Sequence, residues 1–380
     1  MNAGSLAPVV DAIMAHRGDV HAPPAALLAI RVDGETHRAA AGIADLGTGE
    51  SASPAHAQDL ASVSKVLTTL ALQVLFSRDQ VRPHTRLGEV LGGRAGVHAG
   101  ATLDQLARHR AGLREWWPLY LEPGAADDPV AAALALPPRC APDTARHYSD
   151  LGMQALGDVI ATVSGRDFAE AVRELVLDPL GAATVTPGHP APGLPVLAGP
   201  DGDRIEQEMV RSGEPYPVGV DGEGFPWRQH PLTGEVADGN AFHAFHGVAG
   251  HAGWFADLDG LLRVAGAIAD PGILGITPPV ARDLQTAVDE GQARGLRRYT
   301  IVWRGRERLV LGHPGFTGAF LGASPAGPDG PELRVALLAN RLHGAPAPTR
   351  HQLAPVEPLW RDAMAAADTI LNPSSTGGRP

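Results

Sequence analysis

The chain is poor in several residue types, and each shortage excludes a class of protein. Among 380 residues there is one cysteine, Cys140, so no disulfide can form within the chain. The formal net charge is −11 with no basic cluster, which argues against nucleic acid or an anionic membrane surface as a partner. Residues 1–20 carry neither a basic segment nor a long apolar run. We therefore expect no signal peptide, no transmembrane helix and a cytoplasmic protein.

Lysine is the scarcest charged residue, and its one occurrence is informative. Of the 31 lysine and arginine residues, only Lys65 is a lysine. It follows Ser62 by three residues, in an apolar run that reaches Phe76 without glycine or proline. The run predicts a helix, which places the two side chains one turn apart on one face. A buried, neutral lysine can take the proton of a serine nucleophile, whereas arginine cannot be deprotonated. A chance Ser-x-x-Lys is the alternative, and the single lysine disfavours it.

The segment Ala61-Ser62-Val63-Ser64-Lys65 resembles the Ser-x-x-Lys element of the serine β-lactamase and penicillin-binding-protein superfamily. The similarity is greatest to the class C β-lactamase, esterase and D-alanyl-peptidase branch. Two further features continue the resemblance, His109-Arg110-Ala111-Gly112-Leu113 and the segment 247–255. The resemblance implies a serine hydrolase that forms an acyl-enzyme on Ser62, with Lys65 as its base.

A second motif, Tyr148-Ser149-Asp150, precedes a predicted helix. The resembled family has Tyr-x-Asn here, and its tyrosine carries protons between nucleophile, lysine and leaving group. The resemblance therefore assigns that role to Tyr148. Asp150 departs from the pattern, since a carboxylate only accepts hydrogen bonds and favours the charged form of a neighbouring lysine. We expect Asp150 to hold Lys65 and to shift base work toward Tyr148. The alternative is that the pair only caps the following helix.

A third motif, His313-Pro314-Gly315, stands at the end of a predicted strand, in the place of the family's Lys-Thr-Gly. The resemblance gives His313 and Gly315 supporting roles, and the backbone N–H groups of Ser62 and Phe316 the role of oxyanion hole. Pro314 lacks the hydroxyl and the N–H with which β-lactamases hold a substrate carboxylate. It also predicts that the strand lies at a sheet edge.

The order of elements predicts an α+β fold. Strands are expected at 25–32 and 35–43, joined by a turn at Asp33-Gly34, and again at 248–255, 297–304, 306–312, 319–323 and 333–340. Helices are expected at 5–16, 62–76, from 102 to a C-cap at Gly112, and at 151–164, 168–177, 257–269, 278–288 and 357–370. The Gly/Pro-rich stretch 186–230 is predicted to be a cap over the substrate or a mobile loop.

These elements suggest two interleaved parts. Residues 1–80 and 245–372 would form a subdomain in which the N-terminal hairpin joins a C-terminal antiparallel sheet. Residues 81–244 would form an inserted, mainly helical subdomain, and 373–380 a tail.

The function expected is cleavage of an ester or amide bond in a small intracellular substrate, by an esterase, amidase or acyltransferase. A D-alanyl-D-alanine carboxypeptidase or β-lactamase-type hydrolase, and a catalytically silent ligand-binding protein, remain as alternatives. No cofactor is expected. A metal site at His243, His246 and His251 is disfavoured, because no carboxylate or cysteine stands at a supporting spacing.

Overall fold

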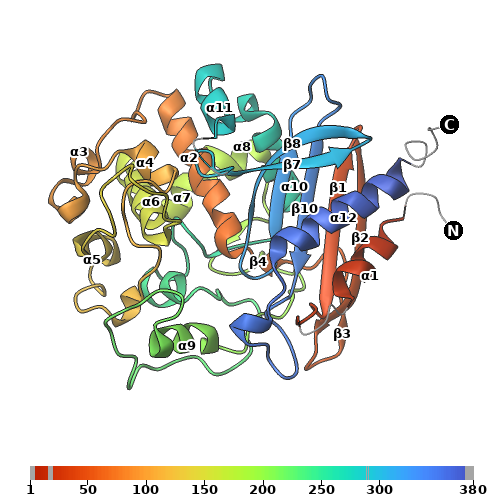
Figure 1. Ribbon diagram of the computed structural model, residues 1–380, viewed down its shortest axis with the longest axis horizontal. Coiled ribbons are helices and arrows are strands. Elements are labelled where there is room, and N and C mark those ends of the chain that lie inside the picture. The colour runs from red at the N-terminus through yellow and green to blue at the C-terminus, as the bar shows by residue number, and fades with distance from the viewer. Residues whose placement is uncertain (1–4, 16–19, 288, 290, 373–380) are drawn as a thin grey trace.

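A central antiparallel sheet, covered by helices on both faces, organises the fold (Figure 1). The structure is a computed structural model, and it describes residues 5–15, 20–287, 289 and 291–372. The N-terminal hairpin joins the C-terminal strands where β1 pairs with β10, with Leu28 opposite Leu337. This confirms the α+β prediction. The seven strands follow one another in space as β3 (Glu50–Ser51), β2 (Glu35–Asp45), β1 (Ala25–Val32), β10 (Leu333–Ala339), β9 (Phe320–Ser324), β8 (Arg306–Pro314) and β7 (Arg297–Trp303).

The predicted hairpin turn is present between β1 and β2. Asp33 and Gly34 both have positive φ, 52° and 79°, as a two-residue turn between twisted strands requires. β1 is buried along nearly its whole length, because helices lie on both sides of it. Its uninterrupted apolar sequence reflects that double burial.

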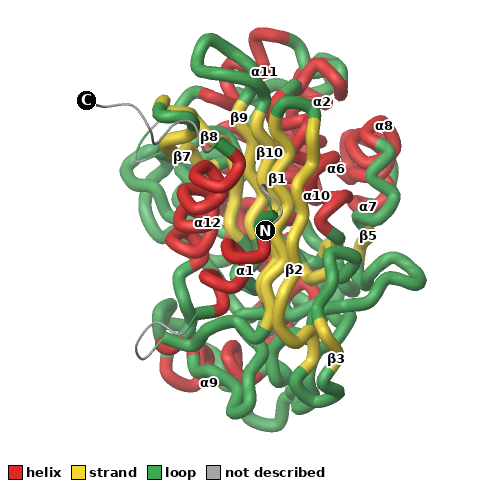
Figure 2. Tube along the Cα trace, turned by 90° about the vertical axis from the view of Figure 1, so that its right-hand side faces the viewer, coloured by secondary structure: helices red, strands yellow, loops and turns green. Residues whose placement is uncertain are grey.

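The first and last helices share one face of the sheet. α1 (Ala7–Met14) and α12 (Val356–Leu371) lie side by side there (Figures 1 and 2). Trp360 of α12 stacks on Phe320 of β9, with ring centroids 4.1 Å apart. The opposite face is covered by α2 (Lys65–Ser77) and α10 (Leu258–Ala269), whose apolar side chains form a second core. α10 begins at Asp257, which caps it by accepting from the Gly260 N–H.

The remaining helices lie mainly in the segment between β4 (Gln58–Asp59) and β6 (Trp254–Ala256). They are α3 (Leu87–Leu91), α4 (Leu103–Ala107), α5 (Pro129–Ala135), α6 (Asp150–Ser164), α7 (Phe168–Val172), α8 (Asp178–Leu180) and α9 (Arg204–Ser212), with α11 (Pro278–Gln285) after α10. A small sheet of β4 (Gln58–Asp59), β6 (Trp254–Ala256) and β5 (Thr186–Pro187) leads into the segment that carries Ser62. The domain limits at 80 and 244 stay a prediction.

Several expected boundaries are wrong. α4 ends at Ala107 with Arg108 as its cap, so Gly112 is not the C-cap. Gly112 has φ 77° and packs against the Cys140 carbonyl, where any side chain would clash. Of the strand expected at 248–255, only 254 and 255 are extended, within β6, which ends at Ala256. The stretch 186–230 contains the unforeseen helix α9. α11 ends at Gln285, and residue 288 and the expected tail 373–380 lie outside the described residues.

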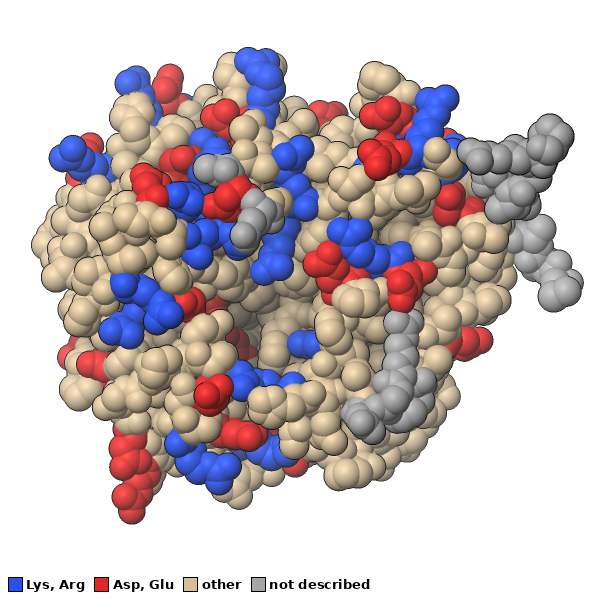
Figure 3. Space-filling model, in the orientation of Figure 1, with Lys and Arg blue, Asp and Glu red and all other residues tan. Residues whose placement is uncertain are grey.

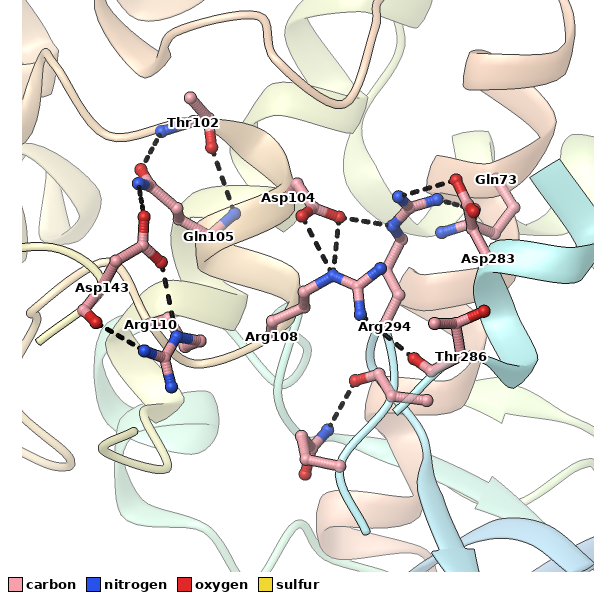
Figure 4. A network of polar contacts seen from close by, with 12 residues as sticks. Gln73, Thr102, Asp104, Gln105, Arg108, Arg110, Asp143, Asp283, Thr286 and Arg294 are labelled. Carbon is pink, nitrogen blue, oxygen red and sulfur yellow. Dashed lines mark hydrogen bonds and ion pairs between the residues drawn. The ribbon is translucent and has the colours of Figure 1, made fainter. Parts of the chain in front are cut away.

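A buried arginine connects α2 to the helical insertion (Figure 4). Arg294 is 3% exposed and donates to Asp104 of α4 at 2.7 Å and to Gln73 of α2 at 3.2 Å. It also pairs with Asp283 of α11 at 3.2 Å. Arg108 also donates to both carboxylate oxygens of Asp104. Because three helices converge on one guanidinium, the segment just before β7 is fixed against α2.

Candidate active site

Ser62 and Lys65 lie together, as their spacing predicts. Ser62 belongs to a short 3-10 helix, Ala61–Ser64, that runs directly into α2. The Lys65 Nζ donates to the Ser62 Oγ at 2.8 Å. Ala61 has φ 42°, which is unusual for alanine, and its N–H is held by the Asp59 carboxylate at 2.7 Å. This strained residue sets the direction in which Ser62 enters the helix.

Lys65 is 1% exposed, yet its environment keeps it charged. Its ammonium lies 2.7 Å from the Asp150 Oδ1 and donates to the backbone carbonyl of His251 at 3.2 Å. Burial lowers the pKa of Lys65, but the Asp150 carboxylate and then Tyr148 outweigh burial and raise that pKa above its ordinary value of 10.5. The resting site therefore holds an ammonium ion. The expectation that Asp150 would hold Lys65 agrees with this geometry.

Tyr148 lies between Lys65 and His313. The Lys65 Nζ is 5.1 Å from its ring centroid, and Tyr148 contributes to the raised pKa of Lys65. The hydroxyl is also 3.3 Å from the His313 Nε2. Ser149, the next residue, caps α6 by accepting from the Gly152 N–H at 3.0 Å. Capping therefore falls to Ser149, which leaves Tyr148 and Asp150 free to face Lys65.

The hydrogen bonds of His313 define its tautomer. Its Nδ1 is 2.7 Å from the Pro314 carbonyl, which only accepts, so Nδ1 carries the hydrogen. Burial and then the charges of Arg297 and Lys65 lower the pKa of His313 well below 6.5, so the ring is neutral. Nε2 therefore has a free lone pair, and the Tyr148 O–H donates to it. The remaining lone pairs of the Tyr148 oxygen are then available to the Lys65 ammonium.

A tight turn presents the backbone N–H of Phe316. The Gly318 N–H donates to the Gly315 carbonyl at 3.0 Å, which fixes the peptide between Gly315 and Phe316. A side chain on Gly315 would meet the Leu60 carbonyl at 2.4 Å, so only glycine permits this approach to the Ser62 segment. The Thr317 hydroxyl donates to the Asp59 carbonyl at 2.7 Å. The two N–H groups expected to form the oxyanion hole thus belong to segments that are hydrogen-bonded to each other.

Pro314 does not lie on an edge strand, contrary to the sequence prediction. β8 has β7 on one side and β9 on the other. The pairing with β7, however, ends at Gly312, whereas the pairing with β9 continues to Pro314. The missing N–H of Pro314 therefore breaks no ladder bond. The edge exists only for the last two residues of β8, where the strand opens onto the site.

A cleft of about 500 Å³ opens in front of Ser62. Figure 3 shows the molecule hollowed near the middle of this face, with both basic and acidic side chains around the hollow. Tyr148, Asp150, His313, Gly315 and Phe316 all border the cleft with Ser62. Apolar side chains line much of the rest, among them Trp116, Ile205, Met209, Tyr216 and Val356. The stretch 186–230 contributes α9 to this lining, so the interpretation as a substrate-facing cap describes it better than a mobile loop.

Sequence reasoning missed several charged residues of the cleft. Arg297 and Arg341 line it, and among the described residues no carboxylate pairs with either. Glu206 lines it from the cap, and Asp238 lines it from the segment that follows the cap. Burial and the neighbouring Asp238 raise the pKa of Glu206 to about 8. None of these residues stands in a short motif with Ser62, so the sequence offered no signal for them.

The histidines near the cap are held by carboxylates that are close only in space. His243 pairs with Asp203 at 2.9 Å, and the His251 Nε2 lies 3.0 Å from the Asp238 Oδ1. In the part of the chain that the structure describes, no group of three or more histidine, cysteine or carboxylate side chains could hold a metal ion. Across the same residues, no helix is long and apolar enough to cross a membrane.

Comparison with known proteins agrees with the geometry of this site. Residues 10–355 match the Beta-lactamase family. The chain belongs to that family. This confirms the resemblance drawn from Ser62, Lys65 and Tyr148. The family match extends over nearly the whole of the described chain, including both the sheet and the helical insertion.

Individual relatives have low sequence identity to this Beta-lactamase family member. Penicillin-binding protein 4 of Amycolatopsis lactamdurans is 31% identical over 42% of this chain, a match that spans 44% of that protein. N-acetylmuramyl-L-alanine amidase of Bacillus subtilis (strain 168) is 25% identical over 75% of this chain and 68% of its own. A structure of D-amino acid amidase from Ochrobactrum anthropi SV3 with L-phenylalanine amide aligns with a TM-score of 0.67 at 16% identity, over 95% of this chain and 97% of that one. At that identity the likeness shows the fold alone.

Proposed function

We propose that this protein is a serine hydrolase that forms an acyl-enzyme on Ser62 and cleaves an ester or amide bond of a small substrate. The observation that carries the proposal is the 2.8 Å contact between the Ser62 Oγ and the Lys65 Nζ at the wall of a cleft. Membership of the Beta-lactamase family supports it, since relatives include amidases. The cleft volume and its apolar lining suit a small substrate with an apolar group.

The charged state of Lys65 defines how the proton moves in this mechanism. An ammonium has no lone pair, so Lys65 takes the Ser62 proton only as it passes one of its own to the Tyr148 oxygen. Tyr148 in turn gives a proton to the departing oxygen or nitrogen of the substrate. The Ser62 Oγ bonds to the carbonyl carbon as the leaving group departs, and no side chain acquires a net negative charge. A water molecule reverses the same transfers and releases the acyl group.

The developing oxyanion would bind the N–H groups of Ser62 and Phe316. Gly315 allows the Phe316 segment to approach the Ser62 segment closely, and His313 accepts a hydrogen bond from the Tyr148 O–H. Asp150 neutralises Lys65 at rest. No step in this scheme requires a metal or an organic cofactor.

A second candidate function is cleavage of a substrate that carries a carboxylate next to the leaving group, as in a D-alanyl-D-alanine carboxypeptidase. One observation favours it. The Arg297 guanidinium lies 5.4 Å from the Tyr148 ring centroid, lines the cleft, and has no carboxylate partner among the described residues. Pro314 argues against β-lactam hydrolysis, because it removes a hydroxyl from the strand beside the substrate. An acyltransferase would use the same acyl-enzyme with another acceptor.

The test is intact-protein mass after brief mixing with a p-nitrophenyl ester, a cephalosporin and a peptide ending in D-Ala-D-Ala, with turnover followed in parallel. We expect a covalent adduct or turnover that Ser62→Ala abolishes. Lys65→Arg keeps the charge and the pairing with Asp150 but cannot relay a proton, so it should lower turnover by about 10²–10⁴-fold. Wild-type rates in Lys65→Arg would reject the relay. No reaction of wild type with any donor, including a fluorophosphonate, would favour a ligand-binding protein without catalysis.

A further inference from the structure

Arg341 carries a buried positive charge that the catalytic scheme above does not use. Its side chain is 7% exposed, and no carboxylate pairs with it in the described chain. Burial lowers the pKa of Arg341 to about 10, so the guanidinium is still charged at neutral pH. A buried charge without a counter-ion is costly unless its donors are satisfied by hydrogen bonds. The groups that accept hydrogen bonds from the Arg341 guanidinium therefore indicate its role.

Those acceptors are two backbone carbonyls on different loops. The Arg341 Nε donates to the Phe316 carbonyl at 2.7 Å, and its Nη1 donates to the Ala354 carbonyl. The guanidinium carbon also lies 5.0 Å from the centroid of the Phe316 ring. That ring is 43% exposed, so few other side chains hold it. The planar fork of arginine suits two diverging carbonyls in a way that a lysine ammonium does not.

Arg341 supplies the restraint that the turn at 315–318 otherwise lacks. Three residues of the turn have hydrogen bonds of their own. The Gly315 N–H donates to the Ala319 carbonyl, and the Gly318 N–H donates within the turn. Thr317 is bonded to the Gln58–Asp59 segment. Phe316 is the residue whose N–H should face the oxyanion. Its carbonyl is bound by Arg341, which fixes the ψ angle of Phe316. The Phe316 N–H belongs to the preceding peptide, which the Gly315–Gly318 bond fixes, so Phe316 is held on both sides.

We propose that Arg341 is a positioning residue for the oxyanion hole: it holds the peptide that follows Phe316, and so braces this residue while its N–H, on the preceding peptide, points into the cleft. The proposal rests on the serine hydrolase function proposed above. A backbone N–H in an oxyanion hole acts mainly in the transition state, because the negative charge on the substrate oxygen develops only there. Arg341 should therefore affect kcat much more than KM. A guanidinium that instead bound an anionic substrate directly would affect KM, and only for substrates that carry the anion.

The experiment compares Arg341→Met and Arg341→Lys with a matched control, Arg308→Met. Arg308 is also buried, 3% exposed, and donates to the backbone carbonyls of Pro325 and Pro331, but it does not line the cleft. Each variant is assayed with a neutral p-nitrophenyl ester and with a carboxylate-bearing donor. Melting temperatures show which losses are merely structural. Affinity for a boronic acid, whose tetrahedral adduct on Ser62 places an oxygen in the oxyanion hole, is measured alongside.

We expect Arg341→Met to lower kcat for both acyl donors by about 10- to 100-fold, with KM nearly unchanged. This loss is somewhat less than that expected when an N–H of the oxyanion hole is removed completely. The affinity for the boronic acid should fall in parallel with kcat. Arg341→Lys should lie between. Free guanidinium ion should restore part of the rate in Arg341→Gly. Arg308→Met should retain its kcat. Equal kcat in wild type and Arg341→Met, or a loss seen only in KM for the anionic donor, overturns the proposal. An inert wild type would instead reject the hydrolase function, and this inference with it.

Discussion

The Lys65 ammonium and the Asp150 carboxylate form an ion pair of 2.7 Å in which Lys65 is 1% and Asp150 18% exposed. The pair lies at the centre of the candidate site, where the proposed mechanism requires Lys65 to move protons. Its charges neutralise each other at rest, so the buried ammonium is stable but is less ready to act as a base. The departure from the family's asparagine therefore changes the acid–base properties of Lys65.

Replacing Asp150 by asparagine should shift the pH dependence of the reaction. Without the carboxylate, burial is left as the main influence, so the pKa of Lys65 should fall. If neutral Lys65 speeds acylation, the rising limb of kcat/KM against pH moves to lower pH in Asp150→Asn. The profile is measured with a neutral ester, so that substrate ionisation plays no part. An unchanged limb would mean that the ionisation of Lys65 does not limit the rate.

The bond from the Tyr148 O–H to the His313 Nε2 makes a second prediction. His313→Leu should lower kcat by about 10-fold, because leucine offers the Tyr148 O–H no acceptor. Since the two residues act as a unit, Tyr148→Phe combined with His313→Leu should be no slower than Tyr148→Phe alone. His98→Leu is the control, as His98 is also buried and donates to the Leu136 carbonyl. Additive losses in the double variant would show that His313 acts independently of Tyr148.

Most of the sheet and the nucleophile pair could be predicted from the sequence, because their signals are local. Asp33-Gly34 fixed the hairpin, and an uninterrupted apolar run fixed α2. The single lysine made the pairing of Ser62 with Lys65 stand out from a common motif. Tyr148 and His313 were found through the resemblance, not through their spacing. The exact place of Pro314 needed the strand order, which no local pattern gives.

The rest of the cleft could not be predicted, because contacts between distant segments build it. Arg341 meets Phe316 across a separation of 25 residues, and Glu206 meets Tyr120 across 86. α9 was missed because its polar sequence lies within a Gly/Pro-rich stretch and buries only Ile205 and Val210. Arginine is also common in this chain, so nothing in its composition separates a cleft arginine from a surface one.

Arg294 should be important for stability but not for chemistry. It joins α2, α4 and α11 through one buried guanidinium and lies outside the cleft (Figure 4). Arg294→Met should lower the free energy of unfolding by about 1–3 kcal/mol, since Asp104 keeps Arg108 and Asp283 remains partly hydrated. Arg173→Met, which removes an exposed pair with Asp178, should cost about 0–1 kcal/mol. Urea unfolding measures both, and equal costs would contradict a connecting role for Arg294.

Glu206 should make stability depend on pH through the cap. The folded protein holds the Glu206 proton up to about pH 8, whereas the ordinary pKa is 4.5. Between these values the unfolded chain has released the proton and the folded chain has not, so the folded state loses stability as pH rises through this window. Glu206→Gln keeps an acceptor for the Gly239 N–H but cannot ionise, so its melting temperature should fall less than that of wild type between about pH 5 and about pH 8. Glu208→Gln, on the same helix but outside the cleft, should follow wild type, and a Glu206→Gln curve parallel to both would show that Glu206 is already ionised in the folded protein.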